Sequence, residues 1–209
     1  MKAVRRLACG GLVALLLPVA AARAVDPGEH LYVDLAGKLP GWTVTPVPRA
    51  NNIELSLIVP PGQTVKEWTD QVAVEIFYGQ PHGTAQDLLA QRFAEIGKAC
   101  EDTAMGPISP VIENGYDTAL RAVACTKIKG RDQGEVTLYK AWVGKERMYL
   151  VARAWRGPAF DKGHVPVKPE VTLQWLSFIQ SVVLCDTRDP RRPCPDAQAP
   201  AAPAPAPAK

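Results

Sequence analysis

The chain has 209 residues, 47% of them hydrophobic and 22% charged, with a formal net charge of +3. This length favours a single domain with a hydrophobic core. The first 24 residues contribute four uncompensated basic side chains and so leave about −1 for the rest of the chain; they are Lys2, Arg5, Arg6 and Arg23. The composition therefore gives no electrostatic reason to expect binding to nucleic acid or to an anionic membrane.

The N-terminus has the pattern of a secretory signal peptide. A basic start precedes an uninterrupted apolar run over residues 12–22, and Ala22 and Ala24 supply the small residues of a cleavage site. The apolar run has 11 residues, whereas a membrane span needs about 20. Cys9 precedes the run and so does not form a lipid-attachment box. We expect residues 1–24 to be removed after Ala24, giving a protein that is periplasmic or secreted and not inserted in the membrane.

The middle of the chain reads as strands, one helix and a meander. Strands are predicted over residues 53–59 and 71–78, followed by a helix over 84–100 that Thr84 caps with Asp87 three residues on. Three further strands follow at 118–129, 135–143 and 147–155, joined by short turn-like segments. This order predicts an antiparallel sheet with a helix packed on it.

The C-terminal part reads as a helix and an extended tail. Pro169 suits a first helical turn, and apolar residues nearly encircle the segment 170–184, which predicts a helix buried against the sheet. Residues 186–209 are rich in Pro and Ala, cannot build a core, and favour extended polyproline II structure. We expect residues 25–185 to form one α+β domain and residues 186–209 to be a disordered tail.

The cysteines predict two disulfides. Apart from Cys9, the chain has Cys100, Cys125, Cys185 and Cys194, an even number in a chain expected to reach an oxidising compartment. Three pairings are possible in principle. The apolar stripe of the first helix should face the sheet and ends at Cys100; its other members are Leu89, Phe93 and Ile96. A helix cysteine that faces the sheet can meet Cys125 on a strand, which leaves Cys185 to pair with Cys194.

The order of elements resembles the PsbP-like fold. The resemblance rests on the stretches GWTVTPV, TAQDLLAQRFAEIG, ENGYDTALRAVACTKIKGRDQGEVTLYKAWVGKERMYLVARAW and LQWLSFIQSVVL, which cover most of residues 41–184. The stretch KEWTDQVAVEIFYG and both cysteine pairs depart from the general pattern. The resemblance implies an α/β/α sandwich, an antiparallel β-sheet flanked by helices, that serves as a binding or assembly accessory without catalytic residues.

The motifs of common enzymes are missing from the sequence. The chain has no G-x-S-x-G, no H-E-x-x-H, no Walker loop, no G-x-G-x-x-G and no C-x-x-C among Cys100, Cys125, Cys185 and Cys194. Its three histidines, His30, His82 and His164, are far apart in sequence, and we interpret them as surface-loop residues. No metal or other cofactor is predicted.

Two polar groups remain as candidate ligand or partner surfaces. Trp68 stands at the start of a strand beside Glu67 and Asp70; an aromatic between acids can mark a pocket, although a core or edge tryptophan is the commoner role. The second group is a basic hairpin that could hold an acidic partner or be a solvated turn; it comprises Lys127, Lys129 and Arg131.

These observations predict a non-enzymatic periplasmic module that binds a small ligand or an envelope protein, or assists assembly. The alternative is an envelope enzyme of unfamiliar type, or an inhibitor of one, with a site between the first hairpin and the meander. Gathering of Glu67, Trp68, Asp70 and a histidine in one cleft would favour the enzyme, and their dispersal would favour the module.

Overall fold

A computed structural model describes residues 28–79 and 81–195. The predicted signal peptide and residues 196–209 of the predicted tail lie outside the described residues. The elements in chain order are β1 (Glu29–Tyr32), α1 (Leu35–Lys38), β2 (Thr43–Ala50), β3 (Ile53–Val59), β4 (Asp70–Tyr78), α2 (Ala85–Ala99), β5 (Cys100–Met105), β6 (Ser109–Glu113), β7 (Tyr116–Ile128), β8 (Gln133–Val143), β9 (Arg147–Pro158), α3 (Pro169–Ser181) and β10 (Val183–Asp186).

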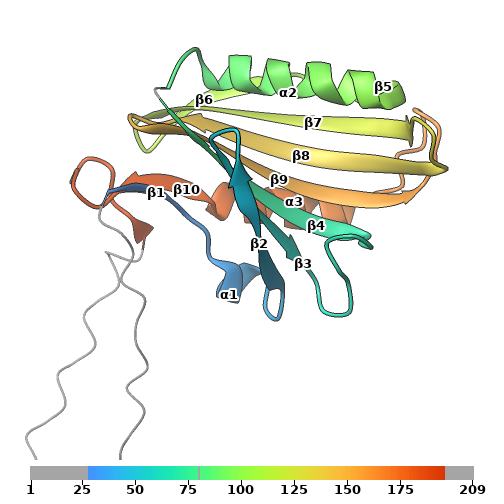
Figure 1. Ribbon diagram of the computed structural model, residues 1–209, viewed down its shortest axis with the longest axis horizontal. Coiled ribbons are helices and arrows are strands. Elements are labelled where there is room, and N and C mark those ends of the chain that lie inside the picture. The colour runs from blue at the N-terminus through green and yellow to red at the C-terminus, as the bar shows by residue number, and fades with distance from the viewer. Residues whose placement is uncertain (1–27, 80, 196–209) are drawn as a thin grey trace, which may run out of the picture.

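The main sheet is antiparallel and has eight strands. Its order is β2-β3-β4-β9-β8-β7-β5, and β6 also pairs with β7. The predicted meander forms the centre as β7, β8 and β9, and the predicted first hairpin is β3 and β4. A separate two-stranded sheet joins β1 to β10 at one end of the molecule (Figure 1).

The two long helices cover opposite faces of the main sheet (Figure 1). Side chains of a strand alternate between faces, and β8 shows this clearly. Leu138 and Trp142 belong to the core under α3, whereas Tyr139 and Ala141 belong to the core under α2. The structure is thus the α/β/α sandwich that the sequence predicted, an α+β fold built on an antiparallel sheet flanked by helices.

Helix α2 begins as predicted and ends one residue early. Thr84 Oγ1 accepts the Asp87 backbone N–H and the Asp87 carboxylate accepts the Thr84 N–H, which completes a capping box. Phe93 is buried and packs edge-to-face on Tyr139, with ring centroids 5.6 Å apart. Cys100 has extended backbone angles and starts β5 directly.

The predicted helix 170–184 is wrong at its C-terminal end. Helix α3 ends at Ser181, Val182 is its extended C-cap, and β10 follows at once. Lys140, 1% exposed, donates from Nζ to the carbonyls of Ile179 at 3.2 Å and Val182 at 3.0 Å and to Glu113 at 2.8 Å. A buried cation at the negative end of α3 satisfies carbonyl groups that helix termini leave without partners.

Both predicted disulfides are confirmed. Cys100 and Cys125 are bonded with their Cα atoms 5.6 Å apart, and Cys185 and Cys194 with theirs 5.0 Å apart. Because Cys100 already belongs to β5, the first bridge joins two neighbouring strands at the point where α2 ends.

Candidate binding cleft

A cleft of about 640 Å³ opens between α2 and the tip of the β2–β3 hairpin. Helix α2 packs mainly on β5, β7 and β8. The part of this sheet face formed by β3 and β4 is therefore less covered by the helix. The volume lies in the range of about 300–1,000 Å³ that is usual for ligand sites. The lining residues include Val47, Pro48, Asn52, Leu55, Glu75, Phe77, His82, Leu88, Gln91, Arg92, Glu95 and Met148.

The floor of the cleft is largely apolar. Leu55 and Phe77 come from β3 and β4, Met148 from β9 and Leu88 from α2. Phe77, Met148 and Leu88 belong to or pack on the core under α2. An apolar ligand surface would therefore contact side chains that the fold itself holds rigid.

An ion pair between α2 and β4 spans the floor of the cleft. Arg92 on α2 forms an ion pair with Glu75 on β4 and a longer one, 3.6 Å, with Glu95. Burial raises the pKa of the Glu75 carboxyl, an effect that the neighbouring Arg92 guanidinium opposes. The cleft thus combines an apolar floor with a few polar groups, the composition typical of sites that bind and orient a ligand.

Tyr78 fixes one rim of the cleft. Its hydroxyl donates to Glu54 Oε2 at 2.6 Å, and this hydrogen bond is the main reason that its pKa is raised. The guanidinium groups of Arg49 and Arg147 lie over its ring at 3.7 and 4.6 Å. Side chains from β2, β3, β4 and β9 therefore hold the hairpin beside the cleft.

The structure separates the predicted Trp68 surface into two places. Glu67 and Trp68 line a second hollow of about 390 Å³ together with Arg131, and the guanidinium of Arg156 stacks on the Trp68 ring at 3.9 Å. Asp70 instead pairs with Arg153 at 2.5 Å, on the α3 side of the sheet. The lining of the second hollow includes no histidine.

The basic hairpin and the histidines are likewise dispersed. Lys127 pairs with Glu101 at 3.3 Å, and Lys129 donates to the Lys98 carbonyl at 2.8 Å. His82 and His164 lie exposed in loops, as predicted. The same prediction is wrong for His30, which lies in β1 directly opposite Cys185.

Sequence reasoning missed the Arg92–Glu75 pair that crosses the cleft. Glu75 interrupts an apolar strand and could have signalled a site, but its partner depends on where α2 rests on the sheet. Sequence reasoning also missed the one group of metal-ligating side chains found in the described part of the chain, His30 with Cys185 and Cys194.

Comparisons with known proteins show a likeness of fold. No family model and no curated protein matches the sequence. Among solved structures, the chain is similar to the solution structure of cyanobacterial PsbP (CyanoP) from Synechocystis sp. PCC 6803. The two share 11% sequence identity with a TM-score of 0.48, over 80% of this chain and 98% of that chain.

Within residues 28–79 and 81–195, no helix is long and apolar enough to cross a membrane.

Proposed function

We propose that this protein is a non-enzymatic binding module exported to an oxidising compartment, and that the cleft between α2 and the β2–β3 hairpin holds an amphipathic ligand or partner segment. Its two disulfides support the compartment, because disulfides persist where thiols are oxidised. Export itself rests on the signal-peptide pattern in residues 1–24.

The observation that carries the binding role is the pairing of charges in the cleft. Arg92 is engaged by Glu75 and Glu95, and the Tyr78 hydroxyl is engaged by Glu54. Covalent catalysis needs a nucleophile within reach of a base that activates it. The Tyr78 hydroxyl and the Glu54 carboxylate have that form, but Glu54 is not among the residues that line the cleft. An apolar floor with internally paired charges instead suits recognition of a ligand that has both apolar and polar parts.

The test uses the fluorescent probe anilinonaphthalene sulfonate, whose aromatic rings suit the apolar floor. We expect the folded protein to enhance its fluorescence and Leu55→Asp, which places a charge on the floor, to abolish most of the enhancement. The matched control is Leu173→Asp on α3, a leucine that is 66% exposed and outside the cleft. Equal enhancement by the two folded variants would refute binding in the cleft.

The alternative of an envelope enzyme has one observation in its favour, the raised pKa of Glu75 in a cleft. Glu75→Gln separates the two functions, since Gln cannot act as a general acid or base. Because the Gln side-chain carbonyl can still accept a hydrogen bond from Arg92, a binding module that carries this substitution should still complement a deletion strain. Loss of complementation by a folded, probe-binding Glu75→Gln protein would favour the enzyme.

A further inference from the structure

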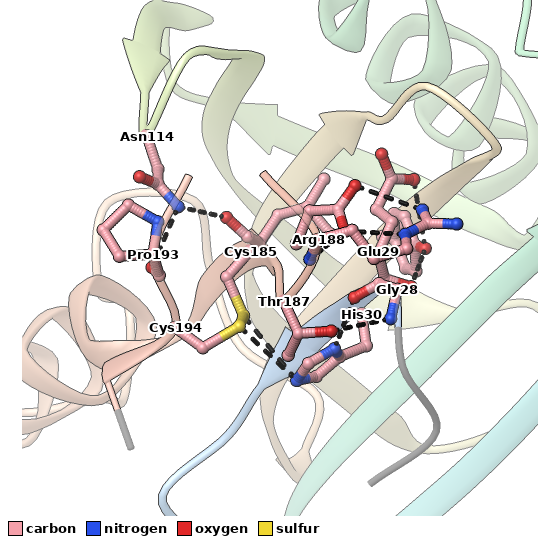
Figure 2. Close-up of a disulfide and its surroundings, with 12 residues drawn as sticks. Gly28, Glu29, His30, Asn114, Cys185, Thr187, Arg188, Pro193 and Cys194 are labelled. Carbon is pink, nitrogen blue, oxygen red and sulfur yellow. Dashed lines mark hydrogen bonds and ion pairs between the residues drawn. A yellow bond between two sulfur atoms is a disulfide. The ribbon is translucent and has the colours of Figure 1, made fainter. Parts of the chain in front are cut away.

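One imidazole nitrogen faces both sulfur atoms of the Cys185–Cys194 bridge. His30 in β1 is the cross-strand partner of Cys185 in β10. Its Nε2 lies 3.6 Å from Cys185 Sγ and 3.7 Å from Cys194 Sγ, as Figure 2 shows. Both cysteines are buried and the histidine is half-buried. Three potential metal ligands therefore converge from the two ends of the described chain.

The other ring nitrogen fixes the tautomer of His30. Nδ1 lies 3.0 Å from the carbonyl oxygen of Gly28, which can only accept, so Nδ1 carries the proton and Nε2 presents its lone pair to the sulfurs (Figure 2). The Gly28 N–H is itself held by Thr187 Oγ1 at 2.8 Å. Histidine ligands in metal sites are usually oriented in this way, by a carbonyl that accepts from the ring nitrogen away from the metal.

The two nitrogen–sulfur distances match those of a tetrahedral metal centre. With metal–sulfur bonds of about 2.3 Å and metal–nitrogen bonds of about 2.0–2.1 Å, a tetrahedral ion places nitrogen and sulfur roughly 3.6 Å apart. The observed Nε2–Sγ distances are 3.6 and 3.7 Å. Two thiolates on such an ion lie roughly 3.8 Å apart, whereas a disulfide holds its sulfurs at about 2.05 Å. Metal and disulfide therefore exclude each other.

The backbone keeps the two cysteines adjacent independently of their bond. Asn114 Nδ2 donates to the carbonyls of Leu184 at 2.9 Å and Pro193 at 3.4 Å, the residues immediately before the cysteines (Figure 2). The N–H of Asp186, the residue after Cys185, donates to the carbonyl of Arg192 at 2.9 Å. Opening the bridge would thus leave both thiols beside the imidazole.

Strand β1 is also fixed to the main sheet. The buried carboxylate of Glu29, next to His30, accepts from the Lys145 N–H at 2.6 Å, the Glu146 N–H at 3.3 Å and the Tyr149 hydroxyl at 3.2 Å. The histidine is therefore positioned by contacts to β9 and the preceding turn as well as by β10.

We propose that His30, Cys185 and Cys194 form a redox-gated site for a thiophilic d¹⁰ metal ion, Zn²⁺ or Cu⁺. A dithiol gives the bridge two electrons and two protons and becomes a disulfide itself, which leaves two cysteine thiols. The ion then displaces the two thiol protons, forms two metal–thiolate bonds and accepts the His30 Nε2 lone pair. A disulfide that accepts two electrons from the two thiolates, and takes up two protons from water to become a dithiol, restores the bridge and releases the ion.

Thiolate and imidazole ligands define the class of ion. Soft thiolates select Zn²⁺ and Cu⁺ over Mg²⁺ or Ca²⁺, which prefer oxygen. Three protein ligands leave a fourth tetrahedral position open for water or an external ligand. Among the described residues, no comparable ligand group surrounds the Cys100–Cys125 bridge, so that bridge serves as an internal control.

The experiment titrates the full chain, reduced with a phosphine and kept without oxygen, with Co²⁺ as a spectroscopic substitute for Zn²⁺. We expect one Co²⁺ per reduced chain with thiolate-to-cobalt charge-transfer absorption, its displacement by Zn²⁺, and no binding by the oxidised chain. Competition with a Cu⁺ chelator measures Cu⁺ affinity separately and shows which ion is preferred. Absence of thiolate absorption with every metal in the reduced, folded chain would overturn the proposal.

Variants test whether the three proposed ligands act together. His30→Gln should weaken Co²⁺ binding at least tenfold, whereas His164→Gln, at an exposed loop histidine, should leave it unchanged. The double variant Cys100→Ser/Cys125→Ser should still bind one ion. Equal affinity of the His30→Gln and His164→Gln proteins, or loss of the ion from the folded double variant, would contradict the assignment; circular dichroism verifies folding in each case.

Discussion

Replacing Lys140 by Met tests whether the buried ammonium stabilises the end of α3. Met preserves the apolar stem and much of the volume but donates no hydrogen bond. Glu113, with a side chain 29% exposed, can regain water, whereas the Val182 carbonyl lies in a fully buried residue and loses this donor. An unsatisfied buried carbonyl costs about 1–3 kcal/mol. The variant also avoids the cost of removing an ammonium from water, which offsets part of the stabilisation lost with its hydrogen bonds. We therefore expect the free energy of unfolding to fall by about 2 kcal/mol.

The assay is urea unfolding followed by tryptophan fluorescence, with Lys162→Met as the control. Lys162 forms an ion pair with Asp102 at the surface, where its side chain is 51% exposed, and its replacement should leave the unfolding midpoint unchanged. Burial lowers the pKa of Lys140. Between that lowered value and the ordinary one, the unfolded state binds more protons, so wild-type stability rises with pH. The difference in free energy of unfolding between wild type and Lys140→Met should therefore increase with pH over this range. A variant as stable as wild type would refute the reasoning.

Two further predictions concern α2 and the strand that follows it. Thr84→Ala removes the capping box and should lower the free energy of unfolding by about 1 kcal/mol, while Thr84→Ser should keep it; equal losses in urea unfolding would show that the hydroxyl does not cap the helix. Cys100→Ser/Cys125→Ser opens a bridge between residues 25 apart and should cost about 3 kcal/mol, and an unchanged midpoint under non-reducing conditions would contradict that value.

The central elements could be predicted because their signals are local. Strand β3 has the predicted bounds, Ile53–Val59, since a run rich in β-branched and leucine residues is closed by turn residues on both sides. Strand β2 was missed because Pro46 and Pro48 argue against a strand. The structure places β2 at the edge of the sheet, where prolines are tolerated.

The two-stranded β1–β10 sheet and the cleft could not be predicted, because the residues that form them are far apart in the sequence. Strand β10 continues the apolar run of α3 without Gly or Pro, so periodicity could not mark where the helix stops. Its partner β1 brings His30 to Cys185 across 155 residues. A group of potential metal ligands this far apart in the sequence has no short-range spacing by which it could be recognised. The Arg92–Glu75 pair likewise depends on the placement of α2, which is a property of tertiary packing.

The pairing of β1 with β10 has a consequence for how the fold is completed. Ribosomes make β1 early and β10 only after the meander and α3, so the first strand must wait for nearly the last one before it can pair. Contacts between such distant segments form late, because closing the intervening loop costs entropy that few local contacts repay. A chain truncated before β10 would lack the partner strand of β1 and keep only the Glu29 contacts that tie β1 to the main sheet, so the two-stranded sheet can be completed only after α3 has been made.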